Sequence, residues 1–323
     1  MPKIRWLYLV LALLVVFSAS CRSQVTGHNR TPTLAQPIPT LDRLSRIPTD
    51  AVKMSLSTDA NPPQVLSADY EKPVPLPGMV NTAGAEDSPF ITPDGNTLYF
   101  FFTPDVKNLP EKQLLDGVTG IYVSHKVGGQ FGPPERIPLQ DPGKLALDGC
   151  EFVQENVMLF CSTREGYQGI HWFMAQYRDG AWRDWKIADF APDFQVGELY
   201  FTIDGSQLYF ASGRPGGKGG LDIWVSTRAD GNWQEPTNVS AVNTPDAEGW
   251  PALSLDATEL WLTRNFGLWR SKSVGGEWQP PEQVISSLAG EATLDAKGNL
   301  YFVHHFYKDD QMLEADIYVA YKR

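Results

Sequence analysis

The sequence predicts an all-β protein, a five-bladed β-propeller with four-stranded antiparallel blades. Residues 198–236 read as four short strands and three turns, and weaker copies recur about every 45 residues. Aromatic residues make up 12% of the chain, which also holds 28 Gly and 25 Pro, a composition that favours short strands over helices. One such sheet cannot bury both of its faces alone, whereas several copies packed in a ring can.

The chain begins with the pattern of an export signal. Basic residues precede an apolar run (6–17) that is too short to span a bilayer comfortably. Residues 1–20 are therefore expected to be a signal peptide. The sequence before Cys21 resembles a bacterial lipoprotein signal, which implies lipidation of Cys21, although Ser18 stands where that pattern usually has an aliphatic residue. Ordinary cleavage and an uncleaved anchor are the alternatives, and all three export the folded part.

Residues 21–63 are rich in Pro, Thr, Ser and Asn and show no sustained period. We interpret them as a flexible tether, with a short helix or turn within 41–53. The propeller domain is expected to cover 64–323.

The repeated unit can be followed along the rest of the chain. Copy one contains the turn signal Pro93–Asn96 between two strands, and copy two contains a tight hairpin at Glu155-Asn156. The five predicted blades are 86–137, 148–187, 196–240, 246–284, and 289–323 completed by 65–76.

The last blade needs a strand from the other end of the domain. Copy five stops after its third strand, and the missing piece aligns with 68–73. We therefore expect 65–76 to pair with the strand ending near Tyr321, which would close the ring and remove two exposed sheet edges.

Three motifs carry a family resemblance: 93–100, 204–212 and 216–224. At these positions the chain, over roughly 65–323, resembles the WD-like propeller repeats of TolB-type bacterial envelope proteins. The resemblance implies a propeller fold and a binding or scaffolding role outside the cytoplasm, and it implies no enzymatic activity. Five-bladed glycoside hydrolases are similar at the level of fold alone.

Acidic residues recur near the start of each inner strand, and basic residues recur near the end of the second strand. A ring of carboxylates at the channel mouth could bind a cationic or polyhydroxyl ligand. Alternatively, one acid–base pair per blade would lock neighbouring strands together. The candidates are Glu86, Glu151, Glu198, Glu248 and Glu291 with Arg164, Arg214, Arg264 and His304, and Asp148 is a rival to Glu151.

Copy one departs from the pairing pattern. Phe102 stands where the basic residue is expected, so Glu86 has no repeat-encoded partner. This makes Glu86, with the adjacent Asp87, the strongest candidate for a functional acid.

Cys150 and Cys161 flank the hairpin of copy two. If the turn centres on Glu155-Asn156, the two thiols are cross-strand neighbours, and a disulfide is the prediction in an oxidising compartment. Two free, buried thiols are the alternative.

Other chemistries find little support. The glycine loop 216–220 precedes a strand and lacks the ending of a phosphate loop, and no His pair has helix-type metal spacing. We expect no metal and no cofactor. The net charge of −11 disfavours nucleic acid as a partner.

The function predicted from the sequence is an exported, lipid-anchored binding or interaction module with its ligand site at the channel mouth. Envelope proteins, peptides or glycans are the expected partners. A carbohydrate-active hydrolase that uses inner-strand carboxylates is the first alternative, and a structural envelope component is the second.

Overall fold

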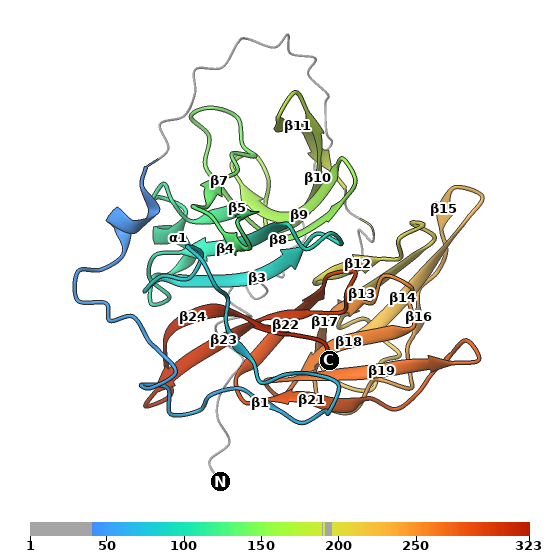
Figure 1. Ribbon diagram of the computed structural model, residues 1–323. Coiled ribbons are helices and arrows are strands. Elements are labelled where there is room, and N and C mark those ends of the chain that lie inside the picture. Colours follow the sequence, from blue (N-terminus) through green and yellow to red (C-terminus); the bar gives the residue numbers. More distant parts are fainter. Residues whose placement is uncertain (1–40, 189, 191–195) are drawn as a thin grey trace.

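The protein is built almost entirely from β-strands. The computed structural model describes residues 41–188, 190 and 196–323, and within them it has 24 strands, one 3-10 helix, η1 (Arg43–Arg46), and one short α-helix, α1 (Pro110–Gln113) (Figure 1). No helix in this part of the chain is long and apolar enough to cross a membrane. The predicted all-β class is confirmed. The predicted signal peptide and Cys21 lie outside the described residues.

Each predicted copy forms a meander of antiparallel strands. Copy one comprises β3 (Ala85–Ile91), β4 (Thr97–Thr103), β5 (Gly120–Val127), β6 (Gln130–Phe131) and β7 (Glu135–Arg136). Copy two comprises β8 (Ala146–Gln154), β9 (Val157–Arg164), β10 (His171–Arg178) and β11 (Ala181–Ile187). Copy three comprises β12 (Leu199–Phe201), β13 (Gln207–Ser212), β14 (Asp222–Ala229), β15 (Asn232–Trp233) and β16 (Thr237–Asn238).

Copies four and five each recruit a short strand from the N-terminal side. Copy four comprises β17 (Glu248–Leu253), β18 (Glu259–Arg264), β19 (Gly267–Val274), β20 (Glu277–Trp278) and β21 (Glu282–Ser286), and β1 (Gln64–Val65) pairs with β21. Copy five comprises β22 (Ala289–Leu294), β23 (Leu300–Lys308) and β24 (Gln311–Ala320), and β2 (Val74–Pro75) pairs with β24. Ala315 of β24 also pairs in parallel with Ala85 of β3, so copies five and one share one nine-stranded sheet and are not the separate antiparallel blades that were predicted.

The segment expected to complete copy five is therefore divided between two sheets. Val74 pairs with Val319, and Tyr70 forms an isolated bridge with Lys322. Gln64 and Val65 instead pair with copy four. The pairing with the last strand thus begins later along the chain than expected, at Tyr70.

The first strand of each copy lies towards the middle of the molecule, and later strands lie further out (Figure 1). β3 contacts both β8 and β22, and β17 contacts both β12 and β22. Between copies two and three, the ring of Phe152 on β8 packs edge-on against Tyr200 on β12, with centroids 5.0 Å apart.

The turns after the inner strands share one chemistry. Asp94 accepts a hydrogen bond from the backbone N–H of Asn96, and Gly95 adopts a φ of +72° that favours glycine. Asp204 and Asp256 accept the equivalent bonds from the N–H groups of Ser206 and Thr258. The Asp residues of these turns thus stabilise them by accepting hydrogen bonds from the backbone N–H groups two residues later.

A β-bulge interrupts four of the five inner strands at equivalent places. The ladder register shifts after Asp87 in β3, Gly149 in β8, Gly249 in β17 and Gly290 in β22. In each case the next residue has a positive φ: Ser88, Cys150, Trp250 and Glu291, with φ of 48°, 56°, 51° and 58°. A bulge re-aims the side chains that follow it, and here those side chains line the pocket described below.

Aromatic residues of neighbouring copies pack together, among them a Trp that recurs near the end of copies two, three and four. Trp182 of copy two packs edge-on against Tyr99 of copy one, and Trp278 of copy four donates a hydrogen bond to the hydroxyl of Tyr209 in copy three. This repeated Trp therefore contributes to packing between sheets.

Candidate functional site

The predicted glutamates do not occupy one repeated position. Counted from the bulge, Glu86, Asp148 and Glu248 lie two residues before the positive-φ residue. Glu291 is itself the positive-φ residue, and Glu151 follows one. In copy three, Tyr200 pairs with Tyr209, and this pair occupies the ladder position that Phe90 and Tyr99 occupy in copy one. Counted back from this pair, Glu198 lies at the position equivalent to that of Glu291. Glu86, Asp148 and Glu248 form a paired set, and Glu151, Glu198 and Glu291 form a pocket set.

Copy four confirms the predicted acid–base pair. Arg264 and Glu248 are both buried, and their side-chain N and O atoms are 3.4 Å apart. The Glu248 carboxylate also accepts bonds from the backbone N–H and the hydroxyl of Thr244, at 3.0 and 2.6 Å. Every charge at this position is therefore compensated.

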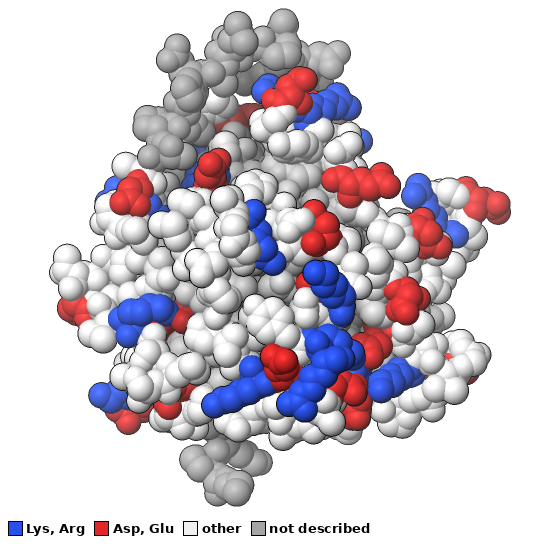
Figure 2. Space-filling model, viewed as in Figure 1, with Lys and Arg blue, Asp and Glu red and all other residues white. Residues whose placement is uncertain are grey.

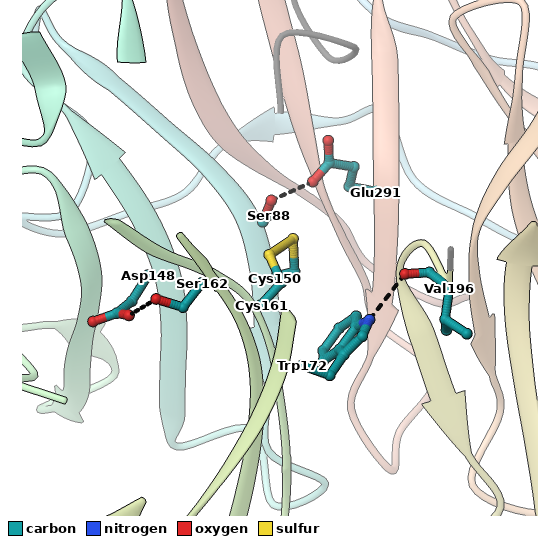
Figure 3. Close-up of a disulfide and its surroundings, with 8 residues drawn as sticks. All are labelled: Ser88, Asp148, Cys150, Cys161, Ser162, Trp172, Val196 and Glu291. Carbon is teal, nitrogen blue, oxygen red and sulfur yellow. Dashed lines mark hydrogen bonds between the residues drawn. A yellow bond between two sulfur atoms is a disulfide. The ribbon is translucent and has the colours of Figure 1, made fainter. Parts of the chain in front are cut away.

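In copy two, Arg164 pairs with the rival acid. Its guanidinium lies 2.5 Å from Asp148, both side chains are buried, and the Ser162 hydroxyl bonds the same carboxylate oxygen (Figure 3). The expected Glu151–Arg164 pair is wrong, because Arg164 pairs with Asp148 and neither oxygen of Glu151 has a partner. Arg164 also stacks near the ring of Phe173, at 4.3 Å.

Glu86 has a partner that the repeats do not encode. Arg43, on η1, lies 2.9 Å from its carboxylate, and Glu86 is fully buried. Thr82 donates two further bonds, from its N–H and its hydroxyl. The Arg43 guanidinium lies over the ring of Phe102, 4.9 Å from its centroid, so the residue that replaces the expected arginine instead cradles one. Burial raises the pKa of Glu86 to about 6, and Arg43 opposes the shift.

Glu86 therefore has a basic partner, Arg43, so the reason for preferring it as the functional acid does not hold. Its neighbour Asp87 is partly exposed and bonds the N–H of Ser88, with its carboxylate 3.9 Å from His305. Neither Glu86 nor Asp87 is among the residues that line the pocket of Glu151, Glu198 and Glu291.

The remaining two basic candidates do not pair as expected either. His304 bonds Asp59, at 2.8 Å, and not Glu291, because its ring extends towards the N-terminal segment. Arg214 lies over Phe210 and Trp224, at 5.1 and 5.4 Å from their centroids. Among the ion pairs of described residues, none joins Arg214 to Glu198, so the pairing predicted for copy three is wrong.

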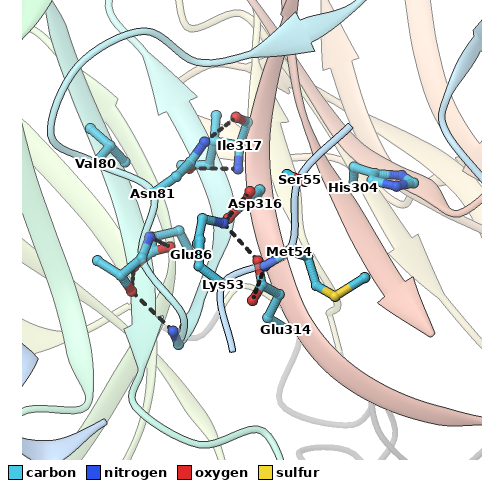
Figure 4. A network of polar contacts seen from close by, with 12 residues as sticks. Lys53, Met54, Ser55, Val80, Asn81, Glu86, His304, Glu314, Asp316 and Ile317 are labelled. Atoms are coloured by element: carbon cyan, nitrogen blue, oxygen red, sulfur yellow. Dashed lines mark hydrogen bonds and ion pairs between the residues drawn. The ribbon is translucent and has the colours of Figure 1, made fainter. Parts of the chain in front are cut away.

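Residues 41–63, expected to belong to the tether, bring further partners to copies one and five. Lys53 forms ion pairs with Glu314, at 2.6 Å, and with Asp316 (Figure 4). Both acids are buried, and burial raises the pKa of Asp316 to about 8 against the opposing effect of Lys53. With Arg43 and Asp59, Lys53 holds this segment against β3, β23 and β24.

The pocket set consists of Glu151, Glu198 and Glu291, from copies two, three and five. They line one pocket with about 440 Å³ of empty space, including the part open to solvent. Its other lining residues are Ser88, Pro89, Phe90, Cys150, Leu199, Tyr200, Trp250, Pro251, Ala292 and Thr293. No Lys or Arg is among them, so this pocket is acidic. The charge of the outer surface differs from that of the pocket. On the face shown in Figure 2, basic and acidic side chains are interspersed.

Glu151 is the least compensated acid in the described chain. It is 6% exposed, and neither carboxylate oxygen has a side-chain or backbone partner beyond its own residue. Burial raises its pKa well above the ordinary value, and the Asp87 carboxylate adds to the shift. A buried carboxylate without partners is costly when ionised.

The other two acids share this environment. Burial, with a smaller contribution from Asp87, raises the pKa of Glu198 to about 7. Glu291 is buried and accepts a 2.6 Å hydrogen bond from the Ser88 hydroxyl (Figure 3). Burial raises the pKa of Glu291 well above its ordinary value, and the carboxylates of Asp87 and Glu198 raise it further. Asp87 thus disfavours the ionisation of all three acids, and Glu198 and Glu151 also disfavour that of Glu291.

A disulfide borders the pocket. Cys150 and Cys161 are joined, with their Cα atoms 5.4 Å apart (Figure 3). The hairpin turn lies at Glu155-Asn156 as predicted, but the bulge makes Gly149 the ladder partner of Cys161. The bond ties the bulge that carries Glu151 to β9.

Chemically, the pocket offers many acceptors and few donors. Its three carboxylates can accept hydrogen bonds or hold protons, and no group of His, Cys, Asp or Glu in the described residues has the geometry of a metal site. Ser88 and Tyr200 escaped prediction because only charged residues were considered as site candidates on these strands. Arg43 escaped because only repeat-encoded partners were considered, although it lies in the segment predicted to be a short helix or turn.

Comparison with known proteins adds only distant similarities. The chain matches no known family model, and no curated protein matches it. Solved structures similar to it include a gluconolactonase from Xanthomonas campestris (13% identity, TM-score 0.44, covering 82% of this chain and 96% of that one). They also include a xylan β-1,4-xylosidase from Bacillus halodurans (15%, 0.47, 76% and 53%) and a putative TolB from Agrobacterium tumefaciens (12%, 0.37, 75% and 92%). At these TM-scores the similarities carry no functional argument.

Proposed function

We propose that the chain is a five-bladed β-propeller whose central pocket binds a small polar ligand. The contacts between inner strands support a ring. They run from β3 to β8, through Phe152 and Tyr200 to β12, then to β17, β22 and back to β3. The pairing of β2 with β24 would complete the last blade. Deleting residues 64–76 should then leave an unstable or aggregating product, and a fully stable product would contradict the ring.

The observation that carries the binding function is Glu151. Glu151 is 6% exposed and has no partner. A neutral residue in its place would stabilise the fold at least as well. Two further acids converge on the same pocket without a basic residue among its lining. The paired set shows that this fold supplies arginines where it needs to neutralise buried acids. Retention of three uncompensated acids is typical of a functional site.

A ligand screen tests this function. We propose to measure the melting temperature of the full chain with panels of small organic cations, polyols and short peptides. A ligand of the pocket should raise the melting temperature. The shift should disappear in Glu151→Gln and persist in Glu111→Gln, which removes an exposed charge on α1. A shift that persists in Glu151→Gln, or the lack of any shift, would contradict the proposal.

A second candidate is a hydrolase that acts on glycosides in the same pocket. The observation that favours it is the pKa of Glu198, which burial raises to about 7, a value suited to a general acid. Release of nitrophenol from aryl glycosides would support this candidate if Glu198→Gln abolished it. Binding without turnover would favour the binding module.

We also propose that the protein is exported and anchored by a lipid on Cys21, with envelope proteins, peptides or glycans as its natural partners. The support is the signal-like sequence of residues 1–21. Metabolic labelling with a radioactive fatty acid tests the anchor. Label should appear on the wild-type chain and be lost in Cys21→Ala, and an unlabelled wild-type chain would contradict it.

A further inference from the structure

We propose that the ligand of the central pocket is a small organic cation, a molecule that carries a protonated amine or a quaternary ammonium group. This inference rests on the proposed binding function and specifies the charge of the ligand. It follows from the donors and acceptors of the pocket, from its walls and from its size.

The first step is the balance between donors and acceptors. Three carboxylates present six oxygens, and one of these, on Glu291, accepts a side-chain hydrogen bond, from Ser88. Both oxygens of Glu151 lack a partner, and the group that bonds the Glu198 carboxylate is the backbone of Glu198 itself. When these carboxylates are ionised, a ligand that satisfies the pocket must therefore bring donors or positive charge.

The second step is a comparison with the paired set inside the same protein. Glu86, Asp148 and Glu248 each receive an arginine, at 2.9, 2.5 and 3.4 Å. The pocket acids lie a few residues further along equivalent strands and receive none from the described chain. The pocket acids therefore lack the cation that each acid of the paired set has, and a ligand in the pocket would supply it. A neutral polyol could donate hydrogen bonds there, but it could not compensate the charge.

The third step distinguishes an organic cation from a metal ion. Metal ions of the Mg²⁺ and Ca²⁺ type need several oxygens converging within a narrow distance range, and the described acids form no such group. The pocket instead has aromatic residues in its wall, Phe90, Tyr200 and Trp250. The faces of aromatic rings attract ammonium groups, and Trp does so most strongly.

The fourth step concerns size. The empty space of about 440 Å³ includes the part open to solvent, so the enclosed part of the pocket is smaller than this figure. Pro89, Pro251 and Leu199 line it with apolar surface. The ligand portion that enters is therefore compact, with the cationic group surrounded by short apolar substituents.

The experiment compares two probes of the same shape and different charge. Choline carries a permanent positive charge, and 3,3-dimethylbutan-1-ol is its neutral carbon isostere. Binding of each to the full chain would be measured by calorimetry at pH 8. We expect choline to bind at least ten-fold more tightly than the alcohol. Glu151→Gln should weaken choline binding at least ten-fold, with little effect on the alcohol, whereas the exposed control Glu111→Gln should change neither.

The outcomes separate this inference from the proposed function. If the alcohol binds as tightly as choline, or if glycerol binds in the pocket and choline does not, the site is real but the cation inference is overturned. If choline, the alcohol and glycerol all fail and the wider panel gives no shift that depends on Glu151, both fall. Glu291→Gln repeats the charge removal on a different strand, so that misfolding of one variant does not decide the result.

Discussion

Two sets of acids on the same inner strands differ in what the protein does with them. Glu248 and its equivalents lie before the bulge and each meet an arginine, whereas Glu151 lies after it and meets no partner among the described residues. Both sets are largely withdrawn from water, so burial alone does not separate them. The presence of a compensating arginine therefore distinguishes the structural acids from the candidate functional ones. The presence of an acid in a repeat does not.

The largest expected effect is the removal of a compensating charge. Arg43→Met would leave Glu86, which is fully buried, without its cation, at a cost of about 3–5 kcal/mol in the free energy of unfolding at pH 8. Urea denaturation measures this loss. The cost should be smaller near pH 4, because a protonated Glu86 no longer needs the arginine.

A matched control lies on the same helix. Arg46 is exposed, and Arg46→Met should leave the stability within about 0.5 kcal/mol of the wild type. The double variant with Glu86→Gln should recover part of the loss. A cost below about 1 kcal/mol for Arg43→Met would show that the paired set is not held by its charges.

Removing a charge from the pocket set should stabilise the protein, whereas removing Arg43 from the paired set should destabilise it. The pKa of Glu198 is raised from 4.5 to about 7, so the folded protein retains a proton that the unfolded chain loses. Stability therefore falls as the pH rises between these values, and the full penalty is present above pH 7. Glu198→Gln removes it and should stabilise the protein at pH 8 by up to about 3 kcal/mol.

The pH dependence is the decisive part of this measurement. At pH 4, where Glu198 is protonated in both states, the variant and the wild type should unfold at the same urea concentration. Glu111→Gln should track the wild type at both pH values. A destabilised Glu198→Gln at pH 8 would mean that Glu198 has a stabilising partner and belongs with the paired set.

These opposite signs could not have been predicted from the sequence. The repeats, the turns at Asp94 and Asp204 and the Glu248–Arg264 pair follow from local signals, because side chains at fixed spacing act on the same or adjacent strands. The bulges do not follow from local signals. Side chains alternate between the two faces of a regular strand, and a pattern based on this alternation misses an inserted residue. Glu151 was therefore aligned with the acids of the paired set.

The partner of Glu86 was missed for a different reason. Arg43 precedes the first repeat and reaches its acid through the tertiary fold, so no spacing rule connects the two. The sequence indicates inner-strand acids as candidates, and the tertiary structure was needed to divide them into the paired set and the pocket set.

The disulfide tests whether the bulge must be held in place. Replacing Cys150 and Cys161 together by Ala opens a short loop, with a sequence separation of 11, and should cost about 2–3 kcal/mol. Because Cys150 lines the pocket next to Glu151, choline affinity should fall as well. Thermal melting and calorimetry measure the two effects. A reducing agent should reproduce them in the wild type and change nothing in the double variant, and an unaltered melting temperature would contradict the role.

The smallest effect is expected for an ion pair outside both sets. Lys144 and Glu165 are paired, but their side chains are 52% and 47% exposed, so water already solvates both charges. Lys144→Met should change the free energy of unfolding by less than about 1 kcal/mol, and 1 M NaCl should reduce the difference further. Urea denaturation at low and high salt measures this next to Arg43→Met. A loss as large as that of Arg43→Met would mean that burial does not set the energy of these pairs, and the distinction between compensated and uncompensated buried acids would lose its physical basis.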